Sequence, residues 1–178
     1  MRLLLDACVL YPNIMRETLL GAAKAGAFTP LWSGRILEEW ARAAARLGPE
    51  GEVIARGEIA ALKAAWPAAE APVPPHDDLV LPDPNDAHVL AAAIGAQAAG
   101  IVTLNLSDFP TRVLARHDVL RFHPDAFLAD WAGESPDAAC ALAARILADV
   151  ERFSGEAWTQ RRLFKKARLP RFAKAVAG

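Results

Sequence analysis

The sequence predicts an α/β protein with a mostly parallel sheet, followed by a helical C-terminal extension. Short apolar segments alternate with amphipathic ones over residues 1–123, which is the pattern of strands alternating with helices. Beyond residue 123 the segments keep a helical periodicity and show no strand signal. We therefore expect an α/β domain over residues 1–123 and a separate group of helices over residues 124–178.

The first elements follow from apolar periodicity and from chain breakers. Residues 2–5 predict a short buried strand that ends at Asp6, and residues 13–25 predict a helix closed by Gly26. A second strand is expected over residues 28–32. The next helix has Ser33 as a plausible N-cap and ends at Gly48-Pro49, and its core-facing stripe consists of Ile36, Trp40, Ala43 and Leu47.

The later elements of the domain are bounded by proline and glycine. A helix over residues 52–66 ends at Pro67, and a proline-dense loop follows it. A helix from Pro84 to about Ala99 leads through Gly100 into a strand at residues 101–104, and a last strand is expected at residues 119–122. Within these apolar patterns, the tryptophans are expected to be core anchors: Trp32, Trp40 and Trp66.

Composition limits the class of protein. A chain of 178 residues accommodates one ordinary α/β domain and a modest appendage. Although 53% of the residues are hydrophobic, no uncharged apolar run approaches the length of a membrane span, and the N-terminus makes a poor signal peptide. We therefore expect a cytoplasmic protein without membrane contact. Cys8 and Cys140 lack the spacing of a zinc site, which predicts two buried reduced thiols.

Charge is unevenly distributed although the formal net charge is only −1. No acid follows Glu156, whereas basic residues follow in quick succession, beginning with Arg161, Arg162, Lys165 and Lys166. Two interpretations are open for this segment. It is either the solvated face of a helix or a contact surface for nucleic acid or a protein partner.

Three acids fall where ligands bind in open α/β sheets, outside the carboxyl ends of the strands. Asp6 ends the first strand, and Asp108 lies just past the strand that contains Thr103. Asp86 lies in the first turn of the helix that leads into that same strand. If the two strands are neighbours, these three carboxylates converge at one edge of the sheet.

A fourth acid is expected from the helix after Ser33, where Glu38 and Glu39 are both candidates. At about 100° per residue, Glu38 points away from the apolar stripe and lies four residues before Arg42, the spacing of a surface ion pair. Glu39 lies on the flank of the stripe and can lean over the edge of the core. We prefer Glu39 and keep Glu38 as the alternative.

Each acid also has a local explanation. Asp83 before Pro84 is a good N-cap, Asp86 complements the helix dipole, and Asp6 and Asp108 suit turns. A shared ligand explains all of them together, because clustered carboxylates repel one another unless a cation is bound. Oxygen ligands favour Mg²⁺ or Mn²⁺ over zinc. For His88 we favour a packing or surface role over ligation.

The chain resembles PIN-domain ribonucleases, especially the toxins of VapBC-type toxin-antitoxin pairs. The resemblance covers residues 2 to about 123 and is carried in family order by LLLDACVLYPN, SGRILEEW, PDPNDAHVLAAAI and IVTLNLSDFP. The later segments FHPDAFLADW and RLPRFAKAV are similar to the C-terminal domain of a subgroup of these proteins.

The resemblance implies a Rossmann-like three-layer α/β/α sandwich and metal-dependent cleavage of RNA. It implies an acidic quartet of Asp6, Glu39, Asp86 and Asp108, with one or two Mg²⁺ or Mn²⁺ ions that activate water. Metal ligands would be Asp6, Asp86 and Asp108, with Thr103, Asn105 and Asp83 in support. Asn105 stands where many relatives carry an acid, which favours a single ion. A cognate antitoxin and a homodimer are further implications.

Two rival functions belong to other classes. A catalytically silent PIN-like module would bind RNA or a protein partner without cleaving RNA, and metal would then not stabilise the native state. A phosphatase of the haloacid dehalogenase type also begins with an aspartate after an apolar strand. That chemistry requires a second aspartate two residues later, where this chain has Cys8, so we rank it low.

Overall fold

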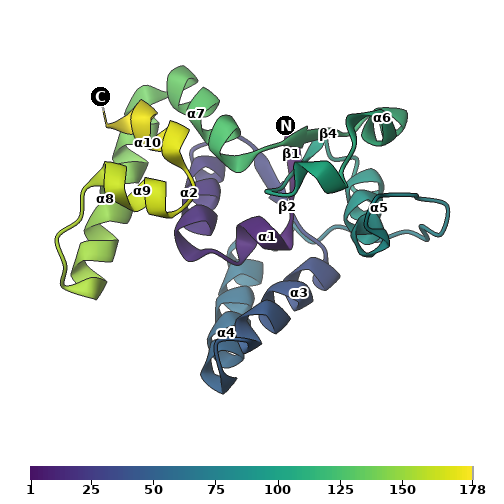
Figure 1. Cartoon of the computed structure of the whole chain (residues 1–178), viewed down its shortest axis with the longest axis horizontal. Helices are drawn as coiled ribbons and strands as arrows, with labels where there is room; N and C mark the ends of the chain where they lie inside the picture. The colour runs from purple at the N-terminus through teal and green to yellow at the C-terminus, as the bar shows by residue number, and fades with distance from the viewer. Residues whose placement is uncertain (178) are drawn as a thin grey trace. The chain divides into compact units, whose positions relative to one another are not determined.

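A computed structural model describes residues 1–177, which fall into two compact units (Figure 1). The first unit joins Met1–Tyr11 to Thr29–Phe122. The second unit joins Pro12–Phe28 to the chain from His123 onward. The domain boundary near residue 123 stays a prediction. Helix α2 (Asn13–Lys24) comes early in the sequence, yet it packs with the C-terminal helices.

The first unit is built on a four-stranded parallel sheet. Its strands are β1 (Arg2–Leu5), β2 (Thr29–Leu31), β3 (Gly100–Val102) and β4 (Leu120–Phe122), in the order β2-β1-β3-β4. In the β1–β3 pairing, Leu3 lies opposite Gly100 and Leu5 opposite Val102. Leu3, Leu4 and Leu5 are wholly buried, as expected of a parallel strand covered on both faces. The predicted parallel α/β fold is confirmed.

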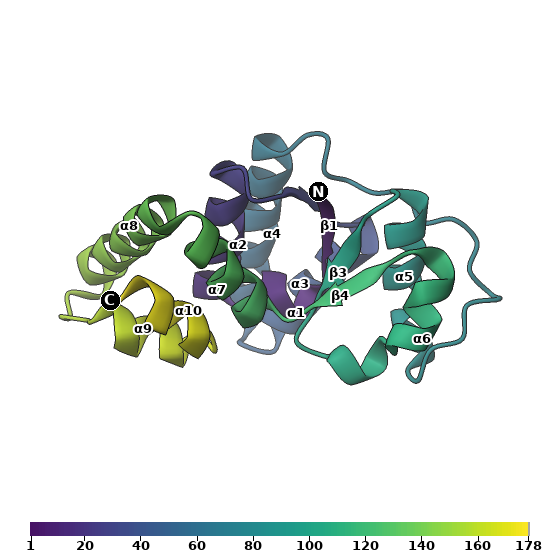
Figure 2. The ribbon, with the colours of Figure 1, turned by 90° about the horizontal axis from the view of Figure 1, so that it is seen from above.

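Helices cover both faces of this sheet. Figure 2 shows the strands between α5 (Ala87–Gly95) on one side and α1 (Ala7–Leu10) and α3 (Gly34–Ala45) on the other. The α3 helix begins at Ser33, whose hydroxyl accepts a hydrogen bond from the backbone N–H of Ile36, as predicted. The unit also contains α4 (Pro49–Ala65), α6 (Thr111–Leu114) and three 3₁₀ turns, η1 (Pro84–Asp86), η2 (Leu106–Asp108) and η3 (Ala115–His117).

Several predicted boundaries are wrong by a few residues. Leu47 was expected in the core stripe of α3, but that helix ends at Ala45 and the Leu47 side chain is 75% exposed. The helix after Asp83 begins as the 3₁₀ turn η1 and ends at Gly95 instead of near Ala99. The strand β3 ends at Val102, so Thr103 lies in the loop beyond it.

The second unit is entirely helical. It consists of α2 (Asn13–Lys24), α7 (Pro124–Glu134), α8 (Pro136–Ser154), α9 (Gln160–Lys166) and α10 (Pro170–Val176). The α2 helix packs against α7 and α8, and Gly21 lies so close to Leu142 that a side chain there would displace the leucine. Phe164 and Phe172 pack edge to face with centroids 5.0 Å apart.

A buried carboxylate joins α7 to α10. Asp125 is 3% exposed, and its oxygens accept hydrogen bonds from the backbone N–H groups of Arg171 and Phe172 at 2.9–3.0 Å. These are N–H groups of the first turn of α10, which no residue of that helix can satisfy. Asp125 therefore fixes the start of the last helix to α7.

Three further expectations concern membrane spans, the cysteines and the tryptophans. None of the helices formed by residues 1–177 has the length and apolar character that a bilayer span requires. Both cysteines are unpaired, as predicted. The prediction that both are buried is wrong, because Cys140 is exposed on α8 and Cys8 is half-buried. Trp32 and Trp40 are buried as predicted, whereas Trp66 is only half-buried.

Candidate active site

The site begins where two adjacent parallel strands end. Asp6 follows β1 and is 6% exposed, and Thr103 follows β3 and is fully buried. The backbone N–H of Asp6 donates to Val102 O at 3.1 Å, which continues the pairing of the two strands. The Thr103 hydroxyl donates to Asp6 Oδ2 at 2.7 Å. The sheet therefore places both side chains at its carboxyl edge.

Cys8 completes a small hydrogen-bonded network around Asp6, and its contribution was not foreseen. The Cys8 thiol donates to Asp6 Oδ2 at 3.0 Å, and Cys8 Sγ accepts from Leu104 N–H at 3.3 Å. Burial, followed by the negative charge of Asp6, raises the pKa of Cys8 to about 12. The thiol therefore stays protonated and acts as a donor. Asn105 contributes its backbone N–H, which donates to Thr103 Oγ1 at 3.0 Å.

Asp86 shows that the predicted acids gather in one neighbourhood. Its partial burial, and then the charges of the nearby acids, raise the pKa of Asp86 to about 6. The acids that act on it, in decreasing order, are Asp6, Asp83, Asp108 and Glu39. We call these five residues the acid cluster. Since all of them belong to the first unit, its fold brings together residues that are up to 102 positions apart in the sequence.

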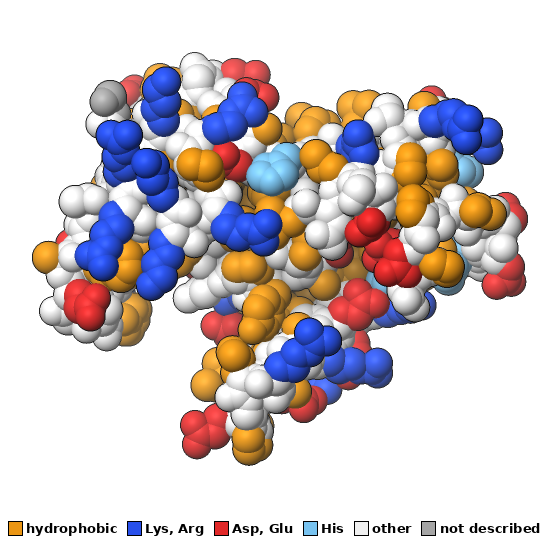
Figure 3. Space-filling model, in the orientation of Figure 1, with side chains coloured by type: hydrophobic (Ala, Val, Ile, Leu, Met, Phe, Trp, Pro, Cys, Tyr) orange, Lys and Arg blue, Asp and Glu red, His pale blue; other side chains and the backbone are white. Residues whose placement is uncertain are grey.

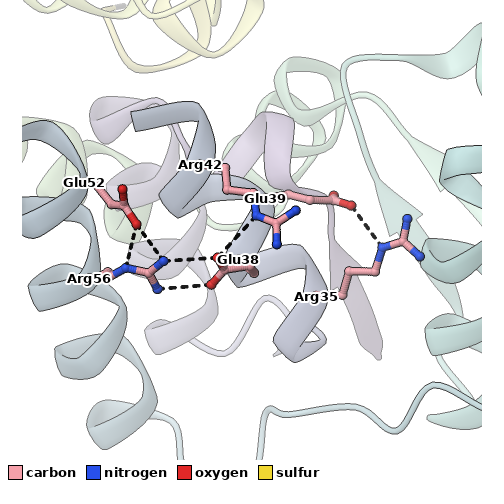
Figure 4. Close-up of polar contacts among 6 residues, drawn as sticks. All are labelled: Arg35, Glu38, Glu39, Arg42, Glu52 and Arg56. Carbon is pink, nitrogen blue, oxygen red and sulfur yellow. Dashed lines mark hydrogen bonds and ion pairs between the residues drawn. The ribbon is translucent and has the colours of Figure 1, made fainter. Parts of the chain in front are cut away.

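Glu38 and Glu39 have different surroundings (Figure 4). Glu38 accepts hydrogen bonds from Arg42 at 3.3 Å, the predicted ion pair, and from Arg56 of α4 at 3.0 and 3.1 Å. Arg56 and then Arg42 lower the pKa of Glu38, which is half-buried. Glu39 instead accepts from Arg35 at 3.3 Å and is the glutamate whose charge reaches Asp86. The structure therefore places Glu39, and not Glu38, in the acid cluster.

His88 is buried beside Glu39. The imidazole is 1% exposed, and its Nε2 lies 2.8 Å from Glu39 Oε1. The distance is that of an ion pair, but the ring nitrogen is not aligned for a hydrogen bond, and Nδ1 has no hydrogen-bond partner. Partial burial raises the pKa of Glu39, yet the stronger combined effect of His88 and Arg35 lowers it. His88 thus packs in the core and holds Glu39 ionised.

The remaining predicted residues have simpler roles in the structure. Asp83 caps η1, because its Oδ1 accepts from Asn85 N–H at 2.9 Å, so the predicted N-cap is confirmed. Asp108 lies in η2 and is half-buried, with the Ser107 hydroxyl 3.4 Å from its Oδ1. The basic residues Arg161, Arg162, Lys165 and Lys166 lie on α9 or at its end, in the second unit.

The chemistry of the acid cluster fits a hard divalent cation. Its donors are carboxylate oxygens, and the neighbouring Cys8 offers a thiol and not a thiolate. Partial burial and then the charges of four neighbouring acids raise the pKa of Asp86, so negative charge is concentrated there. Within residues 1–177, however, no three His, Cys, Asp or Glu side chains are already arranged to hold one ion. Binding would therefore require side-chain rotation.

The parallel sheet, with acids from separate segments at its carboxyl edge, is the arrangement of a PIN domain. The family model described as "PIN domain" matches residues 2–107, which is more than half of the chain. The protein therefore belongs to the PIN-domain family.

A more particular similarity is local. Over 45 residues the chain is 49% identical to the putative ribonuclease VapC50 of Mycobacterium tuberculosis (strain ATCC 25618 / H37Rv). The matched segment is 25% of this chain and 27% of that protein, so the chain matches only about a quarter of its curated relative. No solved structure matches the chain.

Proposed function

We propose that the protein is a metal-dependent endoribonuclease and the toxin of a toxin-antitoxin pair, working with Mg²⁺ or Mn²⁺ on RNA. The observation that carries this proposal is the Asp6 carboxylate held by Thr103 and Cys8 where two adjacent parallel strands end, with the charges of further acids close enough to add to burial in raising the pKa of Asp86. Membership in the PIN-domain family and the name of the similar protein, a putative ribonuclease, support it. The antitoxin and a homodimer belong to the same proposal.

The residues of the acid cluster would have different roles in binding the ion and orienting water. Thr103 and Cys8 both donate to Asp6 Oδ2, which fixes the carboxylate and leaves Oδ1 free to bind a cation. Asp86 and Asp108 would complete the ligands, and Glu39, held by His88 and Arg35, would orient water. A bound divalent ion supplies activation of the nucleophile and neutralises charge on the scissile phosphate.

The direct test replaces single carboxylates and measures cleavage of RNA with Mn²⁺ or Mg²⁺. Asp6→Asn, Asp86→Asn and Glu39→Gln are each expected to lower the rate by about 100-fold or more, because each removes charge aimed at the transition state. Glu38→Gln is the matched control, since Glu38 pairs with Arg42 and Arg56 outside the cluster. Undiminished cleavage by both aspartate variants would disprove the nuclease assignment.

A catalytically silent module is the second candidate, and the absence of a ready-made metal group within residues 1–177 favours it. Metal binding separates the two candidates. An ion that binds the native state at 100 times its Kd stabilises it by about 2.7 kcal/mol. We expect Mn²⁺ to raise the melting temperature of the wild-type protein by several degrees and that of Asp6→Asn much less. Equal melting temperatures with and without Mn²⁺ would support the silent module.

A further inference from the structure

Basic residues without acids are concentrated at the C-terminal end of the chain. Seven of its 20 Lys and Arg residues and none of its 21 acids follow Glu156, so residues 1–156 carry eight more acids than basic residues. Nucleic acid would therefore be repelled by most of this protein. The cationic surface, as we call the exposed basic residues of α9, α10 and the turn between them, consists of Arg161, Arg162, Lys165, Lys166, Arg168, Arg171 and Lys174.

In the part of the chain that the structure describes, these seven cations form no ion pair with a carboxylate, which distinguishes them from six basic residues elsewhere in the chain. Arg35, Arg42, Arg56, Lys63, Arg145 and Arg152 each form an ion pair with a carboxylate. Within residues 1–177, no carboxylate pairs with any member of the cationic surface. An ordinary solvated helix face mixes charges of both signs, as α8 does where Asp149 lies beside Arg145 and Arg152.

The helices hold these cations in an ordered array. On α9 the pairs Arg161/Lys165 and Arg162/Lys166 form two rows at i,i+4 spacing, while Leu163 and Phe164 are buried beneath them. Arg162 and Lys166 both lie over the ring of Trp158, at 4.4 and 5.1 Å from its centroid. In Figure 3, Lys and Arg side chains gather over the region where Figure 1 labels α9 and α10.

We propose that the cationic surface of α9 and α10 is a docking site for the phosphate backbone of RNA. The inference rests on the proposed function, because it assigns the holding of the RNA substrate to the second unit. Unpaired cations attract a polyanion through release of its counterions, and this attraction does not depend on base sequence. The acid cluster, which repels phosphate, could then act on RNA that is already bound elsewhere on the chain.

RNA fits this surface better than an acidic protein does. Interfaces between proteins have apolar cores that are depleted in lysine. Among residues 159–177 no large apolar side chain is exposed, because Leu163, Phe164, Leu169, Phe172 and Val176 are all buried. A cluster of cations without exposed large apolar side chains among residues 159–177 has the electrostatic footprint of a nucleic-acid contact.

The experiment measures binding without cleavage. A fluorescein-labelled single-stranded RNA of mixed sequence is titrated with the full chain in EDTA, and fluorescence anisotropy gives Kd at several salt concentrations. The test variant replaces the four cations of the two i,i+4 rows by glutamine: Arg161→Gln, Arg162→Gln, Lys165→Gln and Lys166→Gln. The matched control is Arg145→Gln with Arg152→Gln, which removes two paired arginines of α8 in the same unit.

We expect the fourfold variant to bind RNA at least about tenfold more weakly at low salt. The slope of log Kd against log salt should fall by about 2 to 3, since each phosphate contact with a single strand contributes about 0.7. The control should keep the wild-type slope. If the fourfold variant melts earlier because Trp158 loses its cations, Arg161→Gln with Lys165→Gln, which spares the Trp158 contacts, should lower the slope by about 1 to 1.5.

Two results would overturn the docking site: wild-type protein that does not bind the RNA, or folded variants that bind it with the wild-type slope. The second of these results would favour an acidic protein as the partner of this surface. The nuclease proposal is decided separately by cleavage in Asp6→Asn and Asp86→Asn, because the anisotropy measurement needs neither metal nor the acid cluster.

Discussion

Asp86 lies at the start of α5, where an aspartate side chain commonly caps the helix. Its side chain makes no capping hydrogen bond, although it precedes α5 directly. Its position instead exposes it to four other acids, and that repulsion has a measurable cost in the absence of a cation.

We predict that Asp86→Asn stabilises the metal-free protein at neutral pH. The pKa of Asp86 is raised from its ordinary value of 3.8 to about 6, so the folded state holds the proton more tightly than the unfolded state. The stability that this proton contributes is present below pH 4 and is lost as pH rises through 6. Urea unfolding in EDTA should give equal stabilities near pH 4 and a variant about 1 kcal/mol more stable above pH 6, because water screens the half-exposed carboxyl.

We predict that Cys8 is a positioning residue for Asp6. Cys8→Ala removes the thiol that donates to Asp6 Oδ2 and leaves Leu104 N–H without its acceptor. The cost should be about 1 to 2 kcal/mol in unfolding free energy, and RNA cleavage should fall by about tenfold as the carboxylate loses its orientation. Cys8→Ser keeps a donor and should recover part of both quantities. A variant with full stability and full activity would contradict the role.

At the residue scale, the sequence predicted the Glu38–Arg42 ion pair, while the choice of Glu39 as a site residue stays a prediction. The angular argument separated Glu38 from Glu39 because both lie on α3, and helical geometry alone fixes their directions. It missed the contacts of Cys8 and His88, because Leu104 lies 96 positions from Cys8 and Glu39 lies 49 positions from His88. Only the spacing of Cys8, two residues after Asp6, offered a signal.

At the scale of elements, capping by a distant side chain holds the C-terminal helices together. The α10 helix has seven residues, too few to be stable alone. Asp125 compensates by accepting three hydrogen bonds from its first turn.

We predict that Asp125→Ala destabilises the protein by about 2 to 3 kcal/mol. The substitution leaves the N–H groups of Arg171 and Phe172 buried or half-buried without an acceptor. Urea unfolding followed by circular dichroism measures the loss. Asp130→Ala, on the exposed side of the same helix, should change the stability by less than about 0.5 kcal/mol. Asp125→Asn keeps one oxygen acceptor and should lie between the two.

Element types were predictable from the sequence, whereas element ends were less so. All four strands and the long helices follow from periodicity and from Gly or Pro breakers. The short helix α1 was not expected, because four residues show no period. The end of α5 was placed too late because alanine favours helix up to Gly100, while the chain turns at Gln97 with φ 51°.

At the scale of the whole molecule, the order of elements in the chain is not their grouping in space. The periodicity of α2 predicts a buried apolar face but cannot say which partner buries it. The structure places α2 with α7 and α8, so the second unit contains two separate parts of the chain.

We predict that a chain ending at Phe122 does not fold normally. It would contain the complete sheet of the first unit, yet α2 would lose α7 and α8 and expose Met15, Leu19 and Leu20, which are now buried. Exposed apolar faces of this size promote association. Size-exclusion chromatography should show aggregated material, and circular dichroism a reduced melting temperature. A monomer that melts like the full chain would show that the first unit folds independently of the C-terminal helices.

The two cysteines differ in accessibility, so that one of them can be labelled selectively. Cys140 stands exposed on α8, while the Cys8 thiol is enclosed beside Asp6 and keeps its proton. Maleimide reacts with accessible thiolate, so a fluorophore should attach at Cys140 alone. Without any engineered substitution, the wild-type chain would then carry a single optical reporter on the helical unit that we propose to hold RNA.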